Sequence, residues 1–210
     1  MRAFIYTGGT VHISYITEHP KGDDLILAAD SGIRNALSLG VTPAIVLGDF
    51  DSFPVEDIPK RAEKLQVPAE KDMTDTQYAV DEAVKRGAKE IYLICGTGGR
   101  FDHAISNMCL IEGLYKRGVR CIIVSGQNRI RYRKDAGIIM IRDKNYKYFS
   151  VLAADEKVKG VSIEGGKYPL NKKTLTRAYQ YAVSNEIEKN AALITVKKGG
   201  IYIVESRDIS

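Results

Sequence analysis

The sequence contains no tryptophan, only six prolines and only three cysteines in 210 residues. The cysteines, Cys95, Cys109 and Cys121, are an odd number without Cys-x-x-Cys spacing, so we expect reduced thiols and no disulfide framework. The scarcity of proline, together with 44% hydrophobic and 27% charged residues, excludes a disordered or collagen-like chain. The composition is that of a globular protein that needs no metal or disulfide staple to fold.

Long hydrophobic runs are absent as well. A helix needs about 18 consecutive apolar residues to cross a membrane, whereas the apolar runs at 122–124 and 138–141 have the length of short buried strands. The N-terminal segment MRAFIYTGG lacks the apolar region and cleavage site of a signal peptide. We therefore expect a cytoplasmic protein with no membrane partner.

The charge is positive, with a formal net value of +5 and a pI of about 9.0. This balance favours anionic partners, nucleic acid among them. Seven cations crowd one stretch: Arg129, Arg131, Arg133, Lys134, Arg142, Lys144 and Lys147. Ile130 and Tyr132 alternate with these cations, as in a strand with one solvated face, so we expect a solubilising face and no nucleic-acid partner. Nucleic-acid binding through residues 129–147 is the alternative.

The first part of the chain alternates short apolar runs with helical patterns. The predicted strands are 3–6, 24–29, 44–47, 90–95 and 120–125, and the predicted helices are 32–39, 57–64, 74–86 and 102–117. Thr74 and Gln77 have the spacing of a capping box, and Gly87 suits a helix end. Continuous apolar strands separated by helices indicate a parallel sheet that is covered on both faces.

After Gln127 the apolar runs become shorter and closer together. Further strands are predicted at 137–141, 146–152, 158–163, 192–197 and 200–205. This spacing is typical of antiparallel strands. The predicted fold class is therefore α/β: a Rossmann-like parallel-sheet domain over residues 1–130, followed by a β-sandwich domain over residues 131–210.

Acidic residues follow the predicted strands at the ends where ligands bind in this class of sheet. Asp49 and Asp51 are two apart in an extended segment, so both carboxylates face the same way. Adding Asp72, Asp75 or Asp30 would collect negative charge that requires a cation. Oxygen ligands of this kind suit Mg²⁺ bound together with substrate phosphates. The alternative is that these aspartates cap turns and helices.

A second motif, residues 96–103, places three glycines, Arg100 and Asp102 before a helix. The glycines allow the backbone to approach phosphate oxygens, and Arg100 adds a bidentate donor. A flexible strand-to-helix turn explains the glycines alone equally well. Gly8-Gly9 is either a second phosphate cradle or a plain turn. His103 is either a general base or a structural residue beside Asp102.

The order and spacing of these motifs resemble the thiamine pyrophosphokinase family. The matching segments are Ala29-Asp30-Ser31-Gly32, Gly48-Asp49-Phe50-Asp51-Ser52, Asp72-x-Thr74-Asp75, Gly99-Arg100-Phe101-Asp102-His103 with Asn107, Ser184-Asn185 and Gly199-Gly200. The resemblance implies a thiamine diphosphokinase with an α/β catalytic domain and a thiamine-binding β-sandwich. It also implies a homodimer with thiamine bound where the subunits meet. The implied reaction is Mg²⁺-dependent transfer of pyrophosphate from ATP to the thiamine hydroxyl, releasing AMP.

The resemblance also implies roles for individual residues. Asp49, Asp51 and Asp72 would hold Mg²⁺ and, with Arg100, form the catalytic set. The implied ATP-binding residues are Asp30, Ser31, Asp75, Arg100, Asp102, His103 and Asn107. Ser184 and Asn185 would bind thiamine. Asp51 and Asp72 are alternative candidates for the base that accepts the hydroxyl proton.

Three other functions compete with this one. A pyrophosphokinase could act on another hydroxymethyl heterocycle, such as a pterin. The Gly-Asp-x-Asp motif also occurs in metal-dependent phosphohydrolases, but these enzymes normally use several histidines, and this chain has only His12, His19 and His103. A module that senses nucleotide or thiamine without turnover is the third alternative.

Overall fold

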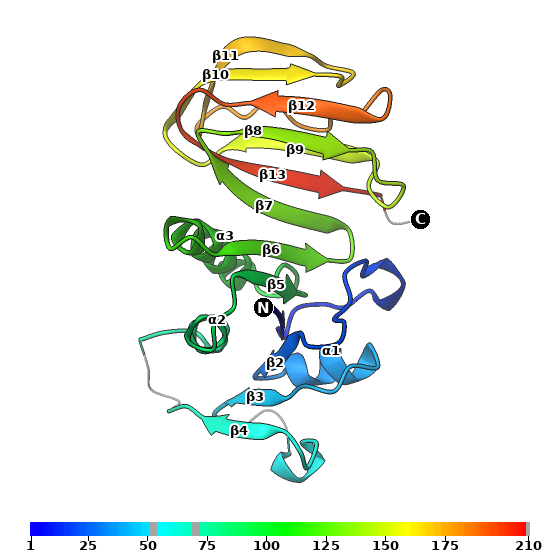
Figure 1. Cartoon of the computed structure of the whole chain (residues 1–210), viewed down its shortest axis with the longest axis vertical. Helices are drawn as coiled ribbons and strands as arrows, with labels where there is room; N and C mark the ends of the chain where they lie inside the picture. Colours follow the sequence, from blue (N-terminus) through cyan, green and yellow to red (C-terminus); the bar gives the residue numbers. More distant parts are fainter. Residues whose placement is uncertain (51–53, 69–71, 209–210) are drawn as a thin grey trace. The chain divides into compact units, whose positions relative to one another are not determined.

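The computed structural model describes residues 1–50, 54–68 and 72–208 (Figure 1). The chain divides into two compact units, Met1–Gly126 and Gln127–Ser210. The strands of the first unit are β1 (Arg2–Tyr6), β2 (Leu25–Ala29), β3 (Ile45–Gly48), β4 (Glu63–Gln66), β5 (Glu90–Ile94) and β6 (Arg120–Ser125). They pair in parallel in the order β4-β3-β2-β1-β5-β6.

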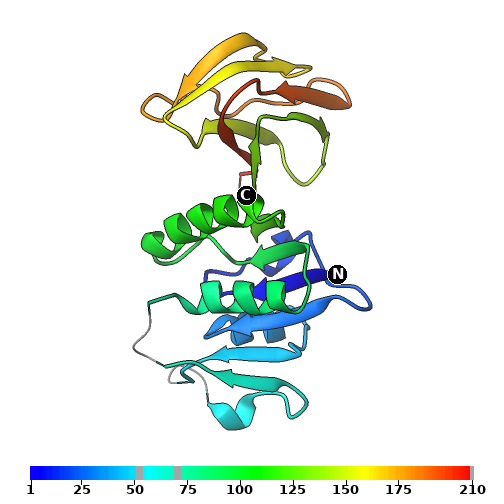
Figure 2. The same ribbon diagram turned by 60° about the vertical axis from the view of Figure 1, so that its left-hand side comes forward.

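Three α-helices connect these strands: α1 (Gly32–Ser38), α2 (Asp75–Lys85) and α3 (Phe101–Lys116). Two short 3₁₀ turns, η1 (Ile13–Tyr15) and η2 (Val55–Asp57), complete the described elements of this unit. Figure 2 shows α1 and α2 on opposite faces of the sheet. The central strands are therefore buried on both sides, which explains why β1 reads as a continuous apolar run with Phe4 and Tyr6 almost fully buried.

The predicted helix at 57–64 is wrong. The structure has only the η2 turn at its start and places β4 over Glu63–Gln66, where it pairs with β3. Pro59 lies in the first turn of the predicted helix, where proline is tolerated, so it is the pairing of Glu63–Gln66 with β3 that prevents a helix here. Instead, the Ala62 N–H donates to the Pro59 carbonyl at 2.8 Å, closing a turn that leads into the edge strand.

The second unit is built from antiparallel strands. They are β7 (Asn128–Lys134), β8 (Gly137–Ile141), β9 (Tyr148–Ala153), β10 (Lys157–Glu164), β11 (Leu170–Thr176), β12 (Ala191–Thr195) and β13 (Gly200–Ser206). One set pairs in the order β7-β13-β9 and the other in the order β11-β10-β12-β8. Phe149, Val151, Ile163, Ile194 and Ile203 belong to the core of this unit. A parallel α/β unit followed by an antiparallel β unit confirms the predicted fold class.

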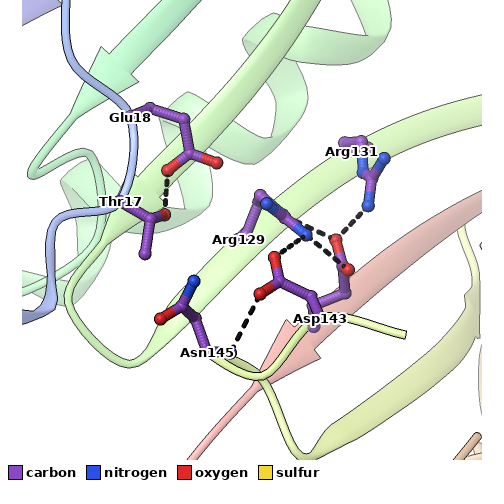
Figure 3. A network of polar contacts seen from close by, with 7 residues as sticks. Thr17, Glu18, Arg129, Arg131, Asp143 and Asn145 are labelled. Atoms are coloured by element: carbon purple, nitrogen blue, oxygen red, sulfur yellow. Dashed lines mark hydrogen bonds and ion pairs between the residues drawn. The ribbon is translucent and has the colours of Figure 1, made fainter. Parts of the chain in front are cut away.

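Part of the basic stretch is paired inside the second unit (Figure 3). Arg129 donates to both carboxylate oxygens of buried Glu205, at 2.7 and 2.8 Å, and to Asp143 at 3.0 Å. Arg131 also bonds Glu205. Burial raises the pKa of Asp143, but the backbone N–H of Asn145 and the charge of Arg129 outweigh it and hold that pKa below its usual value. These two arginines therefore join β7 to β13.

Among the helices of the described residues, none has the length and hydrophobicity needed to cross a membrane.

Candidate functional site

A cleft of about 240 Å³ lies in the first unit, at the carboxyl ends of β1, β2 and β5. Parallel α/β sheets bind ligands at this edge because the strand ends and helix starts converge there. The cleft is lined by residues 7–9, 29–31, 74–76, 95–96 and 98–100, which include Gly8, Asp30, Asp75 and Arg100. His103 and Asn107 line it from α3.

Glycines let the walls of the cleft pack closely. A Cβ on Gly8 would lie 2.2 Å from Ser31 Oγ, and one on Gly9 would lie 2.1 Å from the Cys95 carbonyl oxygen. Gly98 and Gly99 have φ angles of +130° and +72°, a region in which side chains are strained. The main chain therefore lines the cleft along two glycine walls, Gly8–Gly9 after β1 and Gly98–Gly99 before α3.

Asp30 and Ser31 join β2 to α1. Asp30 has a φ of +49°, and its N–H donates to the Leu47 carbonyl at 2.7 Å, so the turn is tied to the neighbouring strand. Ser31 precedes the helix but makes no side-chain cap. Both residues line the cleft.

Asp75 reaches the cleft because the start of α2 is well defined. Thr74 accepts a hydrogen bond from the Gln77 N–H at 3.2 Å, and Gln77 Oε1 accepts one from the Thr74 N–H at 2.8 Å. This reciprocal pair confirms the predicted capping box. Asp75 is the first residue of the helix and lines the cleft.

Arg100 and Asp102 form a forked ion pair at the start of α3. The Arg100 Nη2 lies 2.6 Å from Asp102 Oδ2, and Nε lies 3.3 Å from Oδ1. The hydrogen bond from Arg100 lowers the pKa of Asp102, which also accepts from the His103 N–H at 3.0 Å. Arg100 and His103 line the cleft, and Asp102 is not among its lining residues.

Asn107 is buried beneath the glycine loop. Its side chain is 5% exposed, and Nδ2 donates to the Gly96 carbonyl at 2.8 Å. The amide therefore holds the loop that carries Arg100. Cys95, at the end of β5, is also buried, and burial raises the pKa of its thiol to about 12, so it is a poor nucleophile.

Of the three predicted metal ligands, Asp49 and Asp72 belong to the described residues. Asp49 follows β3 and is half-buried, Asp72 is exposed before α2, and neither lines the cleft. Asp51 lies outside the described residues. Within the residues that are described, no group of three or more acidic, histidine or cysteine side chains is arranged to hold a metal ion.

Ser184 and Asn185, the predicted thiamine contacts, lie between β11 and β12. Ser184 is exposed and has a φ of +54°. Asn185 is 3% exposed. Its Nδ2 donates to the Tyr168 carbonyl, and its Oδ1 accepts from the N–H groups of Tyr168 and Glu186, at 2.8–2.9 Å. The Asn185 amide is thus engaged in holding a turn of its own unit.

Sequence reasoning missed Asn35. Its amide binds the carbonyls of Thr7 and Gly9 in the wall of the cleft. No local pattern marked it, because its partners are 26 and 28 residues away.

Two family models match the chain. "Thiamin pyrophosphokinase, catalytic domain" covers residues 17–123, and "Thiamin pyrophosphokinase, vitamin B1 binding domain" covers residues 128–201. The chain belongs to the thiamin pyrophosphokinase family. It is 30% identical to thiamine pyrophosphokinase of Bacillus subtilis over 209 residues, 97% of this chain and 98% of that protein. The resemblance seen in the motifs is confirmed, and with it the class of enzyme.

Solved structures of thiamin pyrophosphokinases share the fold of the whole chain. The crystal structure of the Bacillus subtilis enzyme matches with a TM-score of 0.89 at 26% identity, covering 100% of both chains. The enzyme from Geobacillus thermodenitrificans matches with a TM-score of 0.85 at 29% identity, covering 100% of this chain and 99% of that one. Both likenesses extend through the α/β unit and the antiparallel unit.

Proposed function

We propose that the protein transfers the pyrophosphoryl group of ATP to the hydroxyl of thiamine, releasing AMP and thiamine diphosphate by in-line attack on the β-phosphorus. The observation that carries the proposal is the position of the cleft. It lies at the carboxyl ends of the parallel strands, and thirteen of its sixteen lining residues fall within residues 17–123, the span of the catalytic-domain match. The second unit matches the vitamin B1 binding domain, which favours thiamine over a pterin as the acceptor.

In this proposal ATP binds along the two glycine walls. Main-chain N–H groups at such loops bind phosphate oxygens, and Arg100 adds a charged, forked donor, oriented by Asp102. Asp30, Ser31, Asp75 and His103 complete the nucleotide site, and Asn107 supports it through Gly96. Transfer of this kind depends mainly on positioning and on neutralising charge.

The proposed metal is Mg²⁺, held by Asp49, Asp51 and Asp72 with the phosphates. Asp49 directly follows β3 and Asp72 precedes α2, outside the cleft lining, whereas Asp30 and Asp75 line the cleft itself. The carboxylate oxygens of Asp30 and Asp75 make the cleft suitable for a hard cation bound with phosphates. Among the described residues that line it, Arg100 is the only one with a permanent positive charge. Bound Mg²⁺ would neutralise the phosphates and the leaving AMP. Asp51 or Asp72 accepts the proton from the thiamine hydroxyl.

Thiamine binds through Ser184 and Asn185 in this proposal. The match of residues 128–201 to a vitamin B1 binding domain supports this placement. Ser184 is exposed and free to meet a ligand, whereas the bonded amide of Asn185 orients the segment. The active form is a cytoplasmic homodimer with thiamine bound where the subunits meet. Sedimentation of the purified protein measures the oligomeric state, and fractionation of cells measures the compartment.

The test is to incubate the purified protein with ATP, Mg²⁺ and thiamine and to quantify the nucleotides and thiamine esters by chromatography. We expect AMP and thiamine diphosphate in equal amounts, with neither formed when the metal is chelated. AMP formed without thiamine diphosphate would contradict thiamine as the acceptor, and a hydroxymethyl pterin would then be the next substrate. No turnover of ATP would contradict the reaction itself.

A further inference from the structure

A loop without regular structure, residues 7–12, forms one wall of the cleft through Thr7, Gly8 and Gly9. The close approaches at Gly8 and Gly9 wedge this loop between the start of α1 and the end of β5. Thr7 is tied to β5 on one side: its N–H donates to the Ile94 carbonyl at 3.0 Å, and its Oγ1 donates to the Cys95 carbonyl at 2.8 Å. The remainder of the loop depends on a contact from α1.

Asn35 provides that contact. Its Nδ2 donates to the Thr7 carbonyl at 2.6 Å and to the Gly9 carbonyl at 2.7 Å. Both hydrogens of one amide are therefore used on alternate peptides of the loop. Asn35 lies on α1, behind the loop, and is not among the residues that line the cleft.

These two bonds set the direction of the loop's N–H groups. The C=O and N–H of a trans peptide point in opposite directions, and no cis peptide occurs in the described chain. With the Thr7 carbonyl turned toward Asn35, the Gly8 N–H points away from α1. This N–H has no protein acceptor among the described residues, and Gly8 lines the cleft.

We propose that Asn35 is a positioning residue for phosphate binding, which sets the Gly8–Gly9 wall so that the Gly8 N–H meets a phosphate oxygen of the nucleotide. The inference rests on ATP binding in this cleft, as proposed above. Asn35 acts through the loop and does not touch the nucleotide. Asn107 holds the facing wall at Gly96 in the same manner, so an asparagine on each of two helices fixes a glycine wall.

The test compares Asn35→Asp and Asn35→Ala with the unmodified enzyme. Aspartate has nearly the shape of asparagine but no N–H to donate, and its charge would face two carbonyls. We expect the KM for ATP to rise about tenfold or more in both variants, since two hydrogen bonds are lost. The KM for thiamine should stay within about twofold of the unmodified value, because the change concerns only the nucleotide wall.

The matched control is Ser38→Ala. Ser38 lies on the same helix, is exposed, and donates only to the carbonyl of Asn35, so both KM values should be unchanged. A purely structural role for Asn35 would lower the active fraction and hence the apparent kcat, with both KM values unchanged. That result would overturn the proposal. If circular dichroism shows that the two variants do not fold, Asn35→Ser, whose short hydroxyl cannot bridge both carbonyls, takes their place with the same expectation.

Calorimetric titration of the unmodified protein with ATP comes first. No binding there would contradict the proposed function. Normal ATP binding by the unmodified protein and by the folded Asn35 variants alike would refute the positioning role alone. Hydrogen exchange supplies a second readout: amides in residues 7–12 should exchange faster in Asn35→Ala than in Ser38→Ala, and equal rates would also refute that role.

Discussion

Ser184 and Asn185 are neighbours in the sequence, but Ser184 is exposed and Asn185 is buried, so we expect different effects when each is replaced. Asn185 is buried, and its amide makes three hydrogen bonds within the second unit. Asn185→Ala should therefore destabilise the protein by about 1–3 kcal/mol, because buried partners are left unpaired. Ser184 is exposed, so Ser184→Ala leaves no buried partner unpaired. This variant should raise the KM for thiamine with little change in stability. Denaturant unfolding and steady-state kinetics measure the two effects, and equal loss of stability in both variants would contradict the distinction.

Arg100 is the cation of the cleft, and its loss should affect ATP selectively. Arg100→Ala should raise the KM for ATP by about tenfold or more, since a charge-assisted contact to phosphate is removed. The KM for thiamine should not change. Arg117→Ala is the matched control, because Arg117 ends the same helix in another exposed ion pair, with Asp81. Equal increases in both KM values would contradict a role of Arg100 that is selective for ATP.

Asp49 follows β3, at the edge of the sheet where the cleft lies. Asp49→Asn keeps the shape of the side chain and removes its charge, so we expect turnover to fall by about 100-fold or more while the fold is retained. Asp23→Asn is the control, because exposed Asp23 precedes β2 at the opposite edge of the sheet. Nearly normal turnover in Asp49→Asn would remove this carboxylate from the proposed metal site.

At the scale of elements, the packing of α1 on β1 depends on Gly32. A Cβ there would lie 2.1 Å from the Tyr6 carbonyl oxygen, so Gly32→Ala should cost about 1–3 kcal/mol of stability. Gly113 provides the contrast, because it lies in α3 with nothing within 4 Å of an added Cβ. Gly113→Ala should stabilise the protein by about 0.5–1 kcal/mol through the higher helix propensity of alanine. Thermal unfolding measures both, and a tolerated Gly32→Ala would refute the close packing.

Elements whose apolar residues recur with a clear helical or strand period were predictable from the sequence, and elements without such a period were not. α2 combines a capping box with buried Val80 and Ala83 on one face, and both features are visible in the sequence. β4 and β11 carry mainly polar or exposed side chains, so no apolar run marks them. They are strands because they pair with β3 and β10, respectively. The sequence alone does not reveal which strands will pair.

For the whole molecule, two half-buried carboxylates, those of Asp24 and Asp143, predict acid sensitivity. Burial raises the pKa of Asp24, but the ion pair with Arg2 and the Lys21 N–H outweigh it and lower that pKa; the pKa of Asp143 in the second unit is lowered as well. A lowered folded-state pKa means that the stabilisation is complete above the ordinary aspartate pKa of about 3.9 and is lost as the pH falls through the folded-state pKa.

We therefore expect the free energy of unfolding to be flat near neutral pH and to decrease below about pH 4. Denaturant unfolding across this range measures it. Asp24→Asn should lower the stability at neutral pH and reduce its loss in acid, whereas Asp23→Asn, next to it and exposed, should follow the unmodified curve. An acid profile of Asp24→Asn as steep as that of the unmodified protein would contradict the assignment.

The sequence by itself determined the fold class and the family. Hydrophobic periodicity is a local property of the sequence, and it distinguishes buried parallel strands from alternating antiparallel ones. The order of the aspartate and glycine motifs is likewise a property of the sequence, and it indicated the family. Only the tertiary structure decided which side chains face the cleft and which brace its walls. Asn35 and Asn107 bind carbonyls from other segments, Asn185 proved to be buried and bonded, and Asp72 stays exposed outside the cleft lining. Such roles depend on contacts between residues far apart in the chain, which exist only after the strands have paired and the helices have packed.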